Sequence, residues 1–120
     1  MSFQRPPVTS QQLAFIGAFT FMRDEVHKNA QEKGWWDEAR NDGEAIALMH
    51  SELSEALEAL RKGNPLDEKL PDFHNLAVEL ADCIIRIMDY TGAYGIPIAE
   101  AIVAKHEFNK TRPHKHGKKF

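Results

Sequence analysis

The stretch of residues 77–90, AVELADCIIRIMDY, constrains the fold more than any other part of the sequence. Drawn as a helix, it is apolar on most of its circumference, which is typical of a helix at the centre of a bundle. Glu79 and Asp82 lie within this apolar run. Because an unpaired carboxylate is costly to bury, such groups are normally neutralised, hydrogen-bonded or bound to a metal. The sequence therefore predicts a central helix that carries a polar site.

Helical periodicity predicts two long helices before this one. The first covers roughly residues 9–33, with Thr9 or Ser10 as its N-cap. The second begins at about Gly43, repeats apolar residues at intervals of three and four, and ends at the KGNP sequence of residues 62–65. No stretch alternates apolar and polar residues in the manner of a strand.

The central helix is expected to start with Asp72 as its cap and to run to about Tyr90 or Ala93. A short fourth helix is expected to begin with Pro97 as its first residue, and a basic, irregular tail occupies about residues 112–120. These elements predict a single all-α domain over residues 1–120, similar to a four-helix bundle. Because four helices this short bury a modest core, we expect oligomerisation to complete it, as a homodimer or homotetramer.

Composition narrows the class of protein. The chain has 120 residues, 42% of them hydrophobic and 28% charged, as in a soluble globular protein. No apolar run approaches the roughly 20 residues that cross a bilayer, so we expect no membrane partner. The first residues lack the layout of a secretory signal, and Cys83 is the only cysteine, which excludes an internal disulfide. Both features predict a cytoplasmic protein.

Charge is unevenly distributed along the chain. Residues 105–120 hold six Lys/Arg against one acid, a charge of +5, which leaves −8 on the rest. The basic segment could be a solvated terminus, a phosphate-binding element or a nucleic-acid contact. The acidic body argues against nucleic acid as a partner.

Four acidic residues form two pairs at helical spacing. Glu52 and Glu55 share one face of the second helix, and Glu79 and Asp82 share a face of the third. If these helices pack side by side, four carboxylates converge and raise one another's pKa unless a cation is present. Oxygen ligands without His or Cys favour Mg²⁺ or Mn²⁺, which usually binds together with substrate phosphates.

Each pair also has a purely structural interpretation. The first pair could lie on a solvated helix face, because a Glu-x-x-Glu spacing is common on surface helices. The second could form a buried ion pair with Arg86 or Lys105.

The ordered pairs resemble the motif of the MazG-like all-α nucleoside triphosphate pyrophosphohydrolases, which are related to dimeric dUTPases and dCTP pyrophosphatases. The likeness covers roughly residues 34–120, from GWWDEARNDGEAIALMHSELSEALEALRKG through VELADCIIRIMDYTGAYG to KHEFNKTRPHKHGKKF. It implies that Glu52, Glu55, Glu79 and Asp82 hold Mg²⁺, with two ions when substrate is bound. It also implies cleavage of a nucleoside triphosphate to the monophosphate and pyrophosphate.

Further residues could complete a nucleotide site. Cations and an amide for the phosphates recur at helical intervals near the C-terminus and on the central helix: Lys105, Asn109, Lys110, Arg112 and Arg86. An exposed, basic helix end is the alternative for the first four. Trp35 and Trp36 could stack on the base, although adjacent side chains point differently and at least one should belong to the core.

The leading hypothesis is metal-assisted attack of water on the α-phosphorus, with Glu52 or Glu55 as the general base. One alternative is a non-catalytic helical dimerisation module with a structural cation site. Another is a di-metal oxygen-handling bundle, which the absence of a Glu-x-x-His pair disfavours. The identity of the base stays open.

Overall fold

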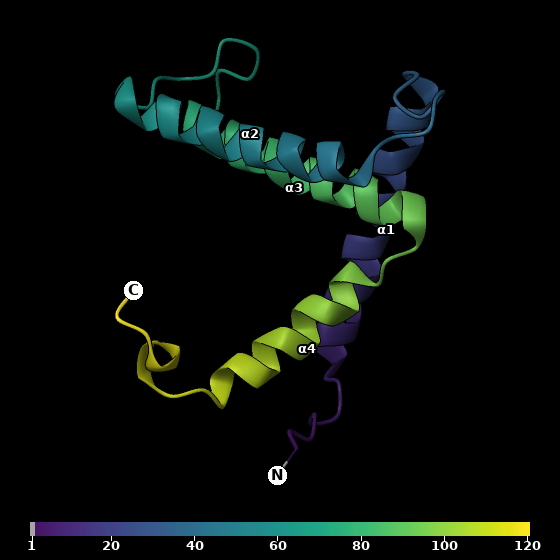
Figure 1. Ribbon diagram of the computed structural model, residues 1–120, viewed down its shortest axis with the longest axis vertical. Helices are drawn as coiled ribbons and strands as arrows, with labels where there is room; N and C mark the ends of the chain where they lie inside the picture. The colour runs from purple at the N-terminus through teal and green to yellow at the C-terminus, as the bar shows by residue number, and fades with distance from the viewer. Residues whose placement is uncertain (1) are drawn as a thin grey trace.

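A computed structural model describes residues 2–120 and contains four α-helices, α1 (Ser10–Glu32), α2 (Asp42–Arg61), α3 (Asn75–Tyr94) and α4 (Ile98–Lys110), and a short 3₁₀ helix, η1 (His114–Gly117). No strand forms in these residues, which confirms the prediction of an all-α fold. Helix α3 packs against both α1 and α2, and α4 packs against α1. Figure 1 shows α2 and α3 side by side as one arm of a V and α4 as the other, with α1 running from beside α4 across the end of the α2–α3 arm. None of the described helices is both long and apolar enough to cross a bilayer.

The N-cap of α1 is Thr9, one of the two residues that the sequence predicts for this position. The hydroxyl of Thr9 accepts a hydrogen bond from the backbone N–H of Gln12 at 3.1 Å, and the Gln12 side chain accepts one from the Thr9 backbone N–H at 2.9 Å. This reciprocal pair is a capping box, which satisfies two backbone donors that have no partner within the helix.

The prediction that Asp72 caps the central helix is wrong. Helix α3 begins at Asn75, and its N-cap residue, His74, makes no side-chain capping bond. Instead, Asn64 of the preceding loop accepts a hydrogen bond from the backbone N–H of Leu76 at 2.9 Å. Asn64 has a φ of 52°, a left-handed conformation that asparagine tolerates better than most residues. The cap is therefore supplied across a loop, which the local sequence pattern does not indicate.

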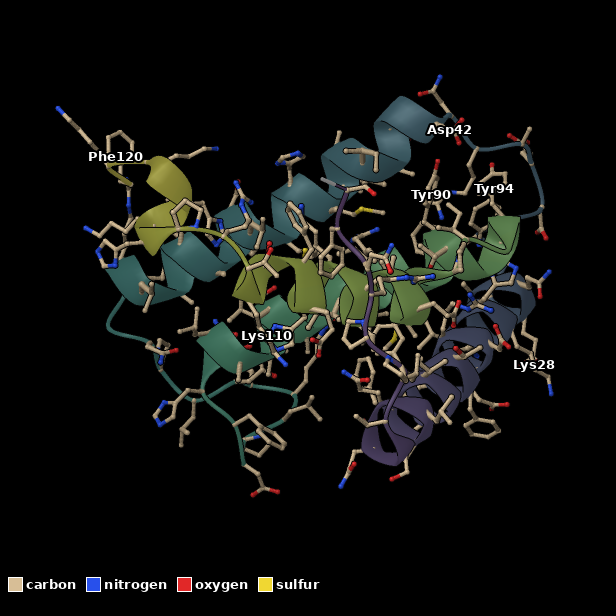
Figure 2. The ribbon with its side chains drawn as sticks, turned by 90° about the horizontal axis from the view of Figure 1, so that it is seen from below. Lys28, Asp42, Tyr90, Tyr94, Lys110 and Phe120 are labelled. Atoms are coloured by element: carbon tan, nitrogen blue, oxygen red, sulfur yellow. The ribbon has the colours of Figure 1, made fainter. Side chains whose placement is uncertain are left out.

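Contacts at several points set the register between α2 and α3. The hydroxyl of Tyr90, near the end of α3, donates to Asp42 at the start of α2 over 3.1 Å, and Figure 2 shows the two side chains close together. Further along, the Cys83 thiol lies 3.5 Å from the carbonyl oxygen of Met49. Ala56 and Ala59 are buried, so α2 can approach α3 closely. This antiparallel register places the middle of α2 opposite the first half of α3.

The core of a single chain is incomplete. Its radius of gyration is 17.1 Å, whereas a compact domain of this length has about 14 Å. No bulky side chain within residues 2–120 is fully buried, and many large apolar side chains on α1, α2 and α3 are more than 40% exposed. An exposed apolar surface of this extent is characteristic of an interaction surface.

Candidate functional site

Glu52, Glu79 and Asp82 lie together between α2 and α3. One carboxylate oxygen of each lies within 4.8 Å of an oxygen of the other two. Glu79 and Asp82 are nearly one turn apart on α3, and Glu52 faces them from the middle of α2. All three side chains are partly buried. We call these three residues the acidic cluster.

Burial and mutual repulsion destabilise the charged forms of two members. The pKa of Glu79 is raised, first by burial and then by the negative charges of Asp82, Glu52 and Glu55. The pKa of Asp82 is raised by burial and by Glu52, although the guanidinium of Arg86 acts in the opposite direction. The acidic cluster therefore holds more negative charge than its protein surroundings compensate.

Glu55 stands apart from the other three predicted ligands. Its side chain is exposed, and it is not one of the three residues whose oxygens lie within 4.8 Å of one another. Its charge nevertheless contributes to the raised pKa of Glu79, so it flanks the acidic cluster. The two predicted acidic pairs therefore lie close together: Glu52, Glu79 and Asp82 form the cluster, and Glu55 lies at its edge.

The donor set fits a hard divalent cation. The acidic cluster offers carboxylate oxygens and no His or Cys, which suits Mg²⁺ or Mn²⁺. A cation among these groups would relieve the repulsion that raises the pKa values of Glu79 and Asp82.

Arg86 is the one guanidinium in contact with the acidic cluster among the described residues. Its Nε donates to Oε1 of Glu52 over 2.8 Å. The sequence also allowed an ion pair between Glu79 or Asp82 and either Arg86 or Lys105. In the structure, Arg86 pairs instead with Glu52 of α2. Lys105 lies elsewhere, with its ammonium 4.8 Å from the centre of the Phe108 ring.

A cleft of about 520 Å³ opens beside the acidic cluster. Its size is within the range of pockets for small-molecule ligands. The C-terminal half of α1 forms one wall. The other walls include Trp35, Ile85 and five charged side chains of α2, α3 and the α1–α2 loop: Glu52, Asp82, Arg86, Asp89 and Arg40. Glu52 and Asp82 therefore face both the acidic cluster and the cleft.

Asp89 is the most highly connected buried charge in the structure. Its Oδ1 accepts from Nε1 of Trp36 at 2.8 Å and lies 2.9 Å from Nδ1 of His27, while its Oδ2 accepts from Nη1 of Arg40 at 3.2 Å. These partners come from α1 and from the α1–α2 loop, so Asp89 fixes both against α3. We call these four residues the Asp89 network.

Removing the Asp89 carboxylate is expected to be strongly destabilising. Asp89→Ala leaves the Trp36 N–H and the Arg40 guanidinium without their acceptor, and breaking a buried ion pair in this way typically costs about 3–5 kcal/mol. Urea unfolding measures the change. The control is Asp24→Ala, which removes a 59% exposed side chain that pairs with Arg23 at 2.9 Å and should change stability by less than about 1 kcal/mol. Equal effects of the two substitutions would contradict this role for Asp89.

The two tryptophans have different surroundings. The Trp36 indole is partly buried in the Asp89 network, with the Arg40 guanidinium 4.8 Å from its ring centre and the rings of His27 and Tyr94 in edge contact at 5.4 and 6.0 Å. Trp35 is 61% exposed and lines the cleft. Of the two candidates for base stacking, Trp35 is the one whose faces the fold leaves accessible.

The predicted phosphate ligands on α4, and Arg112 just after it, do not line this cleft. Lys105 and Arg112 lie over the Phe108 ring, at 4.8 and 5.8 Å, and Lys110 pairs with Glu107 at 2.9 Å. The hydrogen bond from Lys110 is the main cause of a lowered pKa at Glu107. The side-chain oxygen of Asn109 is buried without a hydrogen-bond partner among residues 2–120. Within one chain, only Arg86 of the five predicted phosphate ligands faces the cleft.

Three members of the Asp89 network, namely His27, Arg40 and Asp89, are not among the site residues predicted from the sequence. Asp89 did carry a signal, because it is a third carboxylate in the apolar helix, seven residues after Asp82 and hence on nearly the same face. His27 and Arg40 carry none, since their positions depend on how α1 and the α1–α2 loop fold onto α3.

Comparisons with protein-family models, with curated proteins and with solved structures found no match for this chain. The geometry of the site and the resemblance in its motifs are therefore the basis of the functional proposal.

Proposed function

We propose that this chain is a MazG-like nucleoside triphosphate pyrophosphohydrolase that acts with Mg²⁺ or Mn²⁺. The observation that carries the proposal is the convergence of Glu52, Glu79 and Asp82, from two helices, beside a cleft of about 520 Å³. Two of these carboxyl groups have raised pKa values because burial and the neighbouring carboxylates disfavour their charged forms, and a bound divalent cation would relieve this repulsion.

The residues of the chain have distinct roles in this proposal. Glu52, Glu79 and Asp82 would hold the cation, and Glu55 lies at the edge of this site. A bound divalent ion supplies a water of lowered pKa and neutralises phosphate charge. Glu55 or Glu52 takes the proton of the water that attacks the α-phosphorus. The bond from this phosphorus to the bridging oxygen breaks, and pyrophosphate leaves.

Glu55 is the better supported of the two candidate bases. Glu52 is engaged by Arg86 at 2.8 Å, whereas Glu55 is exposed and belongs to no ion pair among residues 2–120. A carboxylate without a partner is available to accept a proton.

A panel of the eight common ribonucleoside and deoxyribonucleoside triphosphates tests this proposal. With Mg²⁺ or Mn²⁺ present, we expect monophosphate and pyrophosphate from at least one of them and no product after chelation by EDTA. Release of inorganic phosphate in place of pyrophosphate, or no turnover of any nucleotide with either ion, would contradict the proposal.

We also propose that the chain forms a homodimer or homotetramer through α2. Ile46, His50, Leu53, Leu57 and Leu60 alternate in steps of four and three and fall within about 80° on the helix. The four apolar members are 43–53% exposed. This spacing is that of a coiled-coil seam, and a second copy of α2 would cover it. We call these five residues the α2 seam.

The α2 seam also favours a second candidate function, a non-catalytic helical dimerisation module with a structural cation. Under that function EDTA lowers the melting temperature and no triphosphate is consumed. The nucleotide panel therefore separates the two candidates. In either case we propose a cytoplasmic protein, in keeping with a free and buried Cys83.

A further inference from the structure

Arg86 makes limited use of its hydrogen-bonding capacity. Its Nε donates to Glu52 over 2.8 Å, and its terminal nitrogens, Nη1 and Nη2, donate to no acceptor among residues 2–120. The Arg86 side chain is 33% exposed against 14% for Glu52, so the guanidinium lies on the outer side of the pair. Arg86 also lines the cleft. Four N–H groups are therefore available to a molecule in the cleft.

Glu52 is shared between two kinds of positive charge. It belongs to the acidic cluster, where a divalent cation fits, and it is also the partner of Arg86. The guanidinium charge further acts on Asp82, a second member of the acidic cluster. A cation that enters the cluster meets like charge at short range, and the repulsion falls if the guanidinium moves away.

We propose that Arg86 is an exchangeable counter-ion. Without a divalent ion, it balances Glu52; when the ion is bound at the acidic cluster, the guanidinium turns into the cleft and holds a phosphate of the substrate. This inference rests on the proposed function, because it assigns to Arg86 the link between cation binding and triphosphate binding. A guanidinium is suited to both partners, since it pairs with carboxylate and with phosphate through two parallel N–H groups.

If Arg86 exchanges partners in this way, neutralising it should affect cation binding and triphosphate binding in opposite directions. Removing the charge of Arg86 removes the competitor of the cation, so the cation alone should bind more tightly. The same change removes a phosphate ligand, so a triphosphate should bind more weakly. A residue that only supported the fold would weaken both.

Mn²⁺ binding followed by electron paramagnetic resonance tests this inference without using catalysis. The variants are Arg86→Gln and Arg86→Lys, and the control is Arg61→Gln, which removes the same charge from an exposed position at the end of α2. In the absence of nucleotide, we expect Arg86→Gln to lower the Kd for Mn²⁺ about tenfold, or about 1.4 kcal/mol. Arg86→Lys keeps the charge and should stay within about twofold of the native protein, as should Arg61→Gln.

The second arm measures a triphosphate analogue that has an imido bridge between the α- and β-phosphorus atoms, in saturating Mn²⁺. Arg86→Gln should weaken its binding about tenfold, and Arg86→Lys should weaken it less. Unchanged or weaker Mn²⁺ binding by Arg86→Gln without nucleotide would overturn the inference even if the native protein cleaves triphosphates. The expected Mn²⁺ and analogue results in a protein that cleaves no triphosphate would support the exchange and overturn the proposed function.

Discussion

Glu79→Gln is expected to raise the stability of the metal-free protein and to remove its pyrophosphohydrolase activity. The Glu79 carboxylate is disfavoured by burial and by the charges of Asp82, Glu52 and Glu55, and glutamine keeps its shape without its charge. A gain of roughly 1 kcal/mol would raise the melting temperature by about 4 °C. Activity should fall more than about a hundredfold. Removing a residue that only hydrogen-bonds to a metal ligand already lowers metal affinity or activity by about 10–100-fold, and Glu79 is itself a proposed ligand.

Calorimetry with and without Mg²⁺ measures the first effect, and pyrophosphate release measures the second. An ion at 100 times its Kd stabilises the native protein by about 2.7 kcal/mol, and Glu79→Gln should lose most of this gain. The control is Glu58→Gln, which neutralises an exposed carboxylate of α2. We expect it to change neither the melting temperature nor the rate of pyrophosphate release appreciably. A variant that is less stable than the native protein without metal, yet still active, would contradict the role of Glu79.

The raised pKa values of Glu79 and Asp82 also determine how the stability of the metal-free protein changes with pH. Because the pKa values of Glu79 and Asp82 are raised by folding, the folded protein binds more protons than the unfolded chain between the ordinary and the raised values. The contribution of these groups to the stability of the metal-free protein is therefore greatest below the ordinary pKa of a carboxyl group and is lost as the pH rises through the raised values. Saturating Mg²⁺ should remove this loss, because it favours the ionised forms.

If the proposed oligomer forms through the α2 seam, Leu57→Glu is expected to separate it into single chains. Leu57 lies near the middle of the α2 seam and is 53% exposed in one chain, so a second copy would bury it. In a symmetric interface the substitution places two charges in an apolar seam, and an unpaired charge there is costly. Sedimentation equilibrium measures the mass in solution.

The matched control for this substitution is Ser51→Glu. It adds the same charge to an exposed position of α2 that lies outside the seam, and it should leave the mass unchanged. We also expect Leu57→Glu to lower the melting temperature, because the incomplete core of one chain would lose its cover. A native protein that is a single chain at micromolar concentration, or a Leu57→Glu protein that keeps the native mass, would contradict the proposed interface.

The helices and the three residues of the acidic cluster could be predicted from the sequence, because helical spacing identifies the helices and the acidic pairs that they carry. Glu79 and Asp82 stand out in an apolar helix, and Glu52 is the residue of its pair on the side of α2 that faces α3. Glu55 is rotated by about 60° from Glu52 on the helix, and this rotation takes it to the edge of the cluster. The sequence gives the spacing of such a pair, while the packing of α2 on α3 decides which member is in contact.

Features that depend on distant segments could not be predicted. Asn64, and not Asp72, caps α3 because the preceding loop folds back onto the start of the helix. The Asp89 network joins three segments that have no common motif. The basic residues of α4 pack around Phe108 and Glu107, away from the cleft, because α4 packs against α1. Helical spacing predicts that these basic residues share one face of α4, but it does not predict which other element that face packs against.

The central claim is that carboxylates of α2 and α3 hold a divalent cation. Crystals grown with Mn²⁺ and the imido triphosphate analogue test it most directly, through anomalous scattering at the manganese edge. The account predicts a peak among the oxygens of Glu52, Glu79 and Asp82, with the phosphates of the analogue in the adjoining cleft. An analogue bound elsewhere, or no peak at the acidic cluster with Arg86 still on Glu52, would contradict it.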